Sequence, residues 1–122
     1  MEERFKVHEL QVTERILEIV IRHATGHDVS RIVLIRLKIG ELSDLEDEWI
    51  QRYFDYLSRG TIAENAKLAI QRAPIVLECD DCSRSFEVRK DELGGAECPD
   101  CGGSDCRLVS GREYLIENIE VL

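Results

Sequence analysis

The chain has 122 residues, of which 25 are acidic and 16 are lysine or arginine, so its formal net charge is −9. This length allows one compact core and a small additional lobe. The negative charge repels phosphate and argues against a nucleic-acid-binding protein. No apolar run is long enough to span a membrane, and the first residues lack a signal-peptide segment. With five cysteines and no secretion signal, we expect a soluble cytoplasmic protein with reduced thiols.

The first predicted element is an amphipathic helix over residues 10–25. Its apolar side chains recur at three- and four-residue spacing, and Gly26 follows as a helix-terminating glycine. Residues 31–39 alternate between apolar and polar side chains, which is typical of a strand with one buried face. A second helix with an apolar, largely aromatic stripe is predicted over residues 44–58.

Three further strand-like runs follow, at residues 68–72, 75–79 and 113–121, and Pro74 separates the first two. The last run lies beyond a cysteine-rich segment. The sequence therefore predicts an α+β fold in which two helices pack on a small three-stranded sheet. That sheet is expected to contain residues 31–39, 68–78 and 113–121.

The cysteine-rich segment is expected to be an insertion between strands of this sheet. Residues 1–78 together with 110–122 then form an α/β domain, and residues 79–109 form a zinc ribbon. There are no internal repeats and no low-complexity segments.

Four cysteines form two pairs, Cys79-Asp-Asp-Cys82 and Cys98-Pro-Asp-Cys101, separated by fifteen residues. Two tight turns with this spacing can present four thiolates to one tetrahedral Zn²⁺. A shell of four thiolates is closed to substrate and water, so the predicted zinc is structural. The glycine after Cys101 suits a left-handed backbone conformation. A thioredoxin-like redox site is disfavoured because it uses one pair only.

The remaining cysteine and two of the three histidines have simpler interpretations. Cys106 breaks the pair pattern and is expected to be a spare thiol on a loop close to the zinc site, with metal relay as a minor alternative. His23, in the last turn of the first predicted helix, and His27 are expected to be exposed residues and not ligands.

Several motifs in order resemble the HypA/HybF family of nickel metallochaperones along nearly the whole chain. These are His8-Glu9-Leu10, Lys38-Ile-Gly-Glu-Leu-Ser43, Gly60-Thr-Ile-Ala-Glu64, the paired cysteines, Val109-Ser-Gly-Arg-Glu113 and Ile119-Glu-Val121. The resemblance implies a nickel-binding α/β domain and a structural zinc domain. It also implies delivery of nickel, with a partner GTPase, to the large subunit of a nickel–iron hydrogenase, without catalytic turnover.

By the same resemblance, the nickel site centres on His8, with backbone nitrogens around His8 and Glu9 and an acidic side chain at Glu46. A neutral imidazole suits nickel. From the sequence alone, Glu9 is expected to be a solvated acid. Glu46 has a second interpretation, because Ser43-Asp-Leu-Glu46 has the form of a capping box in which its side chain accepts the amide of the cap residue.

In the family, the His-Glu pair directly follows the initiator methionine, whose amino group helps to hold nickel. Here residues 1–6 precede Val7. We hypothesise that native translation starts at codon 7, read as GUG, so that the chain begins Met-His-Glu-Leu. The nickel site is otherwise rebuilt or lost.

Two other functions are compatible with parts of the pattern. One is a zinc-ribbon adaptor of the same family that serves only protein–protein docking. The other is a nucleic-acid-binding ribbon, which is disfavoured because residues 79–109 contain eight acidic and four basic side chains.

Overall fold

The structure, a computed structural model, describes residues 7–122, and the expectations about residues 1–6 lie outside this range. Over the described range the elements are α1 (Val7–Ala24), β1 (Ile32–Gly40), α2 (Asp47–Leu57), β2 (Lys67–Ala73), β3 (Ile75–Cys79), β4 (Ser85–Val88), the 3-10 helix η1 (Lys90–Gly95), β5 (Cys106–Ser110) and β6 (Tyr114–Val121). No helix within the described range has the length and apolar character needed to cross a membrane.

Helix α1 begins three residues before its predicted start. Its buried positions share one face, because they recur at three- and four-residue spacing: Glu9, Thr13, Ile16, Val20 and Ala24. The predicted end is confirmed. Gly26 has φ +89°, and the N–H of His27 donates to the carbonyl of Ala24 at 3.2 Å.

Helix α2 is shorter than predicted, and the predicted capping box is wrong. The cap position is Glu46, with an extended backbone and no side-chain cap hydrogen bond. Its N–H donates instead to Oε2 of Glu9 in α1, at 3.0 Å. A carboxylate from another helix thus binds the amide at the entrance to α2, and a local sequence pattern contains no signal for such a partner. The residues that α2 buries completely are Ile50 and Phe54.

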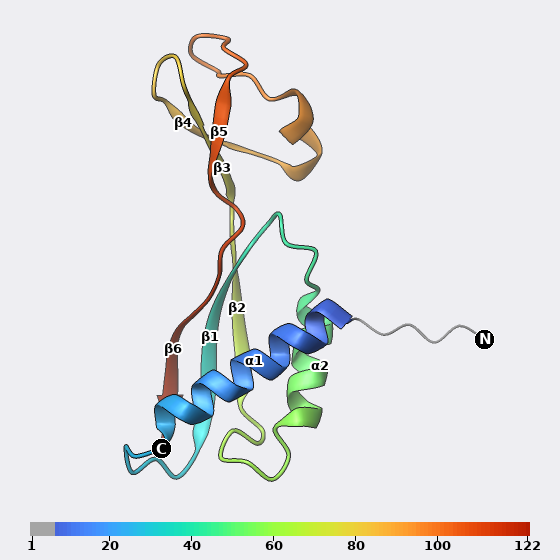
Figure 1. The fold of residues 1–122 in the computed structure, drawn as a ribbon, viewed down its shortest axis with the longest axis vertical. Coiled ribbons are helices and arrows are strands. Elements are labelled where there is room, and N and C mark those ends of the chain that lie inside the picture. The colour runs from blue at the N-terminus through green and yellow to red at the C-terminus, as the bar shows by residue number, and fades with distance from the viewer. Residues whose placement is uncertain (1–6) are drawn as a thin grey trace, which may run out of the picture. The chain divides into compact units, whose positions relative to one another are not determined.

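The first sheet has the strand order β2-β1-β6, with β1 in the centre. Figure 1 shows α1 crossing in front of these strands, and α1 and α2 contact each other. The predicted alternation in β1 is confirmed, since Ile35, Leu37 and Ile39 are fully buried. Two helices with a small three-stranded sheet confirm the predicted α+β class.

The second sheet has the order β4-β3-β5, and both pairings are antiparallel. The assignment of residues 75–78 to the first sheet is therefore wrong. The chain leaves the first sheet at Pro74, which has no N–H to donate to a ladder. Strand β6 follows the second sheet and pairs beside β1, so the cysteine-rich segment is an insertion between strands of the first sheet.

By internal contacts the chain divides into two compact units. One comprises Met1–Leu37, Leu45–Ile70 and Ile116–Leu122, and the other comprises Lys38–Asp44 and Gln71–Leu115. The second unit therefore includes the end of β1 as well as the second sheet. The sequence predicts domain boundaries after residues 78 and 109. Whether the parts on either side fold and function separately stays a prediction.

Within the second unit, the end of β1 lies against the segment that joins β5 to β6. A Cβ added to Gly40 would lie 1.9 Å from the carbonyl oxygen of Gly111, so only glycine fits there. The N–H of Gly40 donates to the carbonyl of Glu113 at 2.7 Å, and that of Leu42 donates to the carbonyl of Gly111 at 2.9 Å. Two motifs some seventy residues apart in the sequence thus meet in space.

The Glu113 carboxylate organises the turn between β5 and β6. It accepts the N–H of Gly111 at 2.5 Å and the hydroxyl of Ser110 at 2.7 Å. These donors favour the charged form, so the Gly111 amide, followed by the Ser110 hydroxyl, holds the pKa of Glu113 below its ordinary value of 4.5.

We expect Glu113→Gln to lower the free energy of unfolding at pH 7 by about 1–2 kcal/mol, because it removes charge-assisted hydrogen bonds. Folding lowers the pKa of Glu113, so its stabilisation is complete above pH 4.5 and is lost as the pH falls through the lower folded value. Urea denaturation at several pH values, with Glu117→Gln as the exposed control on β6, measures this. A difference between wild type and Glu113→Gln that grows on acidification would contradict it.

Candidate metal centres

The two cysteine pairs occupy two turns with the same backbone pattern. In the first turn, the N–H of Cys79 donates to the carbonyl of Arg84 and the N–H of Ser83 donates to the carbonyl of Cys79, both at 2.9 Å. In the second turn, the N–H of Cys98 donates to the carbonyl of Gly103 and the N–H of Gly102 donates to the carbonyl of Cys98, again both at 2.9 Å. Each turn therefore presents its two sulfurs from equivalent positions.

The fifth residue of each turn has a left-handed backbone conformation. It is Ser83 in the first turn, with φ +64°, and Gly102 in the second, with φ +74°. The conformation expected for the glycine after Cys101 is confirmed. The strain at Ser83 was not visible in the sequence, because serine carries no signal for positive φ.

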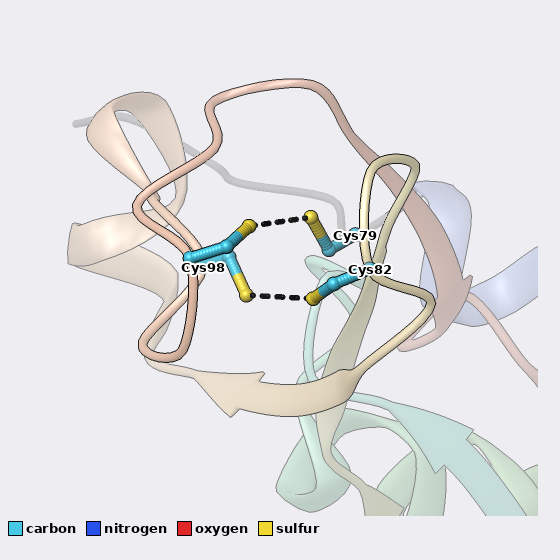
Figure 2. Close-up of side chains that lie close together, drawn as sticks. Cys79, Cys82 and Cys98 are labelled. Carbon is cyan, nitrogen blue, oxygen red and sulfur yellow. Dashed lines mark hydrogen bonds between the residues drawn. The ribbon is translucent and has the colours of Figure 1, made fainter.

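The two turns face each other and bring the four sulfurs together (Figure 2). The Sγ atoms of Cys79 and Cys101 lie 3.5 Å apart, as do those of Cys82 and Cys98. All four sulfurs lie within 4.8 Å of one another. A tetrahedral Zn²⁺ with Zn–S bonds of about 2.3 Å needs sulfurs about 3.8 Å apart, so the cluster fits the donor set and size of such a site.

Hydrogen bonds and neighbouring thiols shift the pKa values of Cys98 and Cys101 in opposite directions. The amide of Cys101 is the leading cause that lowers the pKa of Cys98 to about 7. The amide of Gly103 lowers the pKa of Cys101, but the adjacent thiol of Cys79 and the other two thiols act in the opposite direction and raise it to about 12. Four sulfurs this close cannot all ionise without a cation, and a divalent cation would reverse this effect.

The fifth cysteine, Cys106, lies next to this cluster but is not one of its members. It begins β5, where its partner across the ladder is Cys79. Its half-buried thiol is 3.8 Å from the carbonyl of Gly103. It was predicted to be on a loop, and its place in a strand corrects that. Burial, followed by the charge on Cys79, raises the pKa of Cys106.

The residues predicted for nickel lie at the start of α1 and the entrance to α2. His8 is exposed in the first turn of α1. Glu9 is buried, with 4% of its surface exposed, which corrects the expectation of a solvated acid. Its carboxylate accepts the N–H of Glu46, so the structure brings these two residues together. His23 and His27 are exposed, as predicted.

The first turn of α1 provides further donors. The first four N–H groups of a helix have no acceptor within that helix, and in α1 these include the amides of His8 and Glu9. The anchored carboxylate of Glu9 fixes this turn against the entrance to α2. An imidazole, backbone nitrogens without an acceptor inside the helix, and an acidic residue thus lie in one place.

We expect Ser83→Gly to stabilise the cysteine-rich unit by about 0.5–1 kcal/mol, because glycine relieves the left-handed strain at some cost in chain entropy. Gly102→Ala should destabilise it by about 1 kcal/mol. No atom lies within 4 Å of the position that the new Cβ of Gly102→Ala would take, so the effect is conformational. Chemical denaturation with one equivalent of zinc measures both, and shifts of the same sign in the two variants would contradict the equivalence of the turns.

The sequence and the fold were compared with known proteins. The model of the family described as "Hydrogenase/urease nickel incorporation, metallochaperone, hypA" matches residues 7–121. Hydrogenase maturation factor HypA of Geobacter sulfurreducens is 37% identical over 115 residues, covering 94% of this chain and 99% of the relative. Hydrogenase maturation factor HybF of Escherichia coli K12 is 34% identical with the same coverage.

Solved structures show the same fold. The solution structure of the Ni metallochaperone HypA from Helicobacter pylori superposes with a TM-score of 0.64 at 23% identity, covering 93% of this chain and 97% of that one. A second solution structure of a HypA protein gives a TM-score of 0.72 at 24% identity, with 97% and 98% covered. The matched family model and the relatives confirm the resemblance inferred from the motifs, and this chain belongs to the HypA/HybF family of hydrogenase-maturation nickel metallochaperones.

Proposed function

We propose that this protein binds Ni²⁺ at the start of α1 and delivers it during maturation of a nickel–iron hydrogenase, while zinc in the four-cysteine cluster holds the second sheet and its loops together. The family match over residues 7–121 carries this proposal. Its proposed partners are the nickel-handling GTPase of this maturation and the hydrogenase large subunit, in the cytoplasm. The protein acts by binding and transfer, without catalytic turnover.

Zinc is proposed to be bound by Cys79, Cys82, Cys98 and Cys101. Two sulfur–sulfur separations are 3.5 Å and all are within 4.8 Å, close to the separation of about 3.8 Å around a tetrahedral Zn²⁺. Because no position remains for a water or a substrate, this ion supplies cross-linking and no chemistry. The two turns join segments whose side chains are mostly exposed, so they depend on the metal more than on an apolar core.

The nickel site is proposed to centre on the imidazole of His8 and the free amides of the first turn of α1. A helix N-terminus repels a cation, so bound Ni²⁺ needs anionic donors there. Deprotonated amides supply such charge, and the carboxylate of Glu46 is proposed to add to it. The side chain of Glu9 contributes by position, since its carboxylate binds the amide of Glu46. Square-planar nitrogen donors are a geometry that Ni²⁺ favours.

Replacement of one zinc ligand tests the first half of this proposal. We expect wild type to hold one zinc per chain, Cys98→Ser to lose it and Cys106→Ser to keep it, because Cys106 lies outside the cluster. The loss should disorder the second sheet and leave α1 and α2 folded, since these bury their own apolar faces. Elemental analysis and amide NMR spectra measure the two effects. Zinc loss in Cys106→Ser would show that the ligand set is wrong.

Nickel calorimetry tests the second half. We expect weak binding by the chain as written and markedly tighter binding by a chain that starts at residue 7 with Val7→Met, because a free amine then lies beside the imidazole. His8→Ala should abolish binding in the short form, whereas His23→Ala, on an exposed position of the same helix, should not change it. Glu9→Gln keeps an acceptor for the Glu46 amide and should lose less affinity than Glu9→Ala.

Two outcomes would contradict the proposed nickel site. Equal nickel affinity of the long and short forms would show that the terminal amine is not a nickel ligand. Equal loss of affinity in His8→Ala and His23→Ala would place nickel elsewhere and favour a docking adaptor without nickel transfer.

A further inference from the structure

Cys106 and Cys79 form a directly opposed pair on β5 and β3. Along the central strand β3, the N–H and C=O groups of successive residues point alternately toward β4 and toward β5. The N–H of Cys79 donates to the carbonyl of Arg84, the residue just before β4, at 2.9 Å. The N–H of the next residue, Asp80, donates to the carbonyl of Asp105, the residue just before β5, at 2.8 Å. Cys79 and Cys106 are therefore a non-hydrogen-bonded pair of the β3–β5 ladder.

This pairing has the dimensions of a cross-strand disulfide. The Cα atoms of a non-hydrogen-bonded antiparallel pair lie about 4.5 Å apart, and their side chains leave the same face of the sheet. Disulfides join Cα atoms that are about 4.4–6.8 Å apart. Both thiols also approach Gly103, whose carbonyl is 3.8 Å from Sγ of Cys106 and whose added Cβ would lie 3.4 Å from Sγ of Cys79.

Cys106 is also reachable from outside the cluster. It lines a pocket of about 290 Å³ together with Leu77, Ser104 and the segment from Leu93 to Glu97. Cys79, in contrast, is fully buried. A molecule as small as a peroxide can therefore reach Cys106 without entering the four-sulfur cluster.

We propose that Cys79 and Cys106 form a redox-active pair, in which a peroxide converts the two sulfurs to a disulfide and withdraws Cys79 from the metal cluster. The Cys106 thiolate attacks one peroxide oxygen, the O–O bond breaks, and a sulfenic acid and water result. The Cys79 sulfur then attacks the Cys106 sulfur, the S–O bond breaks, and hydroxide leaves to be protonated to water. Two electrons pass from the two sulfurs to the peroxide. The thiol proton of Cys106 ends in the first water, and solvent protonates the leaving hydroxide, because Cys79 reacts as a metal-bound thiolate.

The pair lowers metal affinity because three thiolates remain where four are needed for a closed tetrahedral site. The inference that the disulfide forms depends only on the pairing of β3 with β5. The inference that metal is released depends also on the zinc site proposed above. We expect oxidation over minutes to hours.

The test treats the full-length zinc-loaded protein with hydrogen peroxide and reads two quantities. Peptide mapping without reduction identifies the disulfide, and a chromogenic chelator follows the zinc released. We expect a Cys79–Cys106 cross-link that appears together with zinc release and reverses on reduction. Cys106→Ser should keep its zinc before oxidation and lose it much more slowly during oxidation. Ser104→Ala, which changes another residue of the same pocket, should behave like wild type.

The competing disulfides are Cys79–Cys101 and Cys82–Cys98, whose sulfurs are 3.5 Å apart in the cluster. If these form first, with the same rate of zinc release in wild type and Cys106→Ser, the proposal is wrong. A Cys79–Cys106 disulfide that forms without zinc release would support the redox-active pair. It would contradict the proposed role of Cys79 as a zinc ligand.

Discussion

Four sulfur atoms held within 4.8 Å of one another are the constraint on which the cysteine-rich part of the chain depends. Charged thiolates this close repel one another. The amide of Cys101 lowers the pKa of Cys98 to about 7, whereas the neighbouring thiols, against the amide of Gly103, raise the pKa of Cys101 to about 12. A divalent cation removes the conflict and converts the two turns into one cross-linked unit. Because each turn already fixes its own backbone through paired hydrogen bonds, the proposed metal would have to join only two preformed halves.

The sequence predicted this cluster because ligand spacing is local. Each pair spans one turn, and the chemistry of four thiolates permits few alternatives. The faces of α1 and β1 were predictable for a related reason, since periodicity directly reports which side chains can be buried together. The predicted fold class followed from these elements and from the strand-like run beyond the ribbon.

The errors arose where partners are distant in the sequence. The sequence predicts one sheet on both sides of Pro74, whereas Pro74 separates two sheets. The strand after it, β3, pairs with β4 and β5, which lie later in the sequence. The sequence predicts a solvated Glu9, because nothing around it in the sequence identifies the amide of Glu46 as its partner. The predicted capping box failed because α2 is capped at Glu46 and not at Ser43. The place of Cys106 opposite Cys79 likewise depends on register, which the sequence did not reveal.

These contacts suggest how the proposed metal sites differ in purpose. The cysteine cluster offers four identical soft donors on opposed rigid turns, a form suited to a permanent ion. The first turn of α1 offers an exposed imidazole and backbone amides, and the buried carboxylate of Glu9 anchors this turn to the entrance of α2. A site that is exposed and partly built from backbone can exchange its metal, as transfer to a recipient protein requires.

X-ray absorption at the zinc and nickel edges of one sample, loaded with one equivalent of each metal, tests this division most directly. The sample should be the short form that starts at residue 7 with Val7→Met. Our account predicts a zinc spectrum with four sulfur neighbours at about 2.3 Å and a nickel spectrum with nitrogen and oxygen neighbours that include imidazole. Sulfur bound to nickel, or imidazole bound to zinc, would contradict the assignment of the two metals to separate sites.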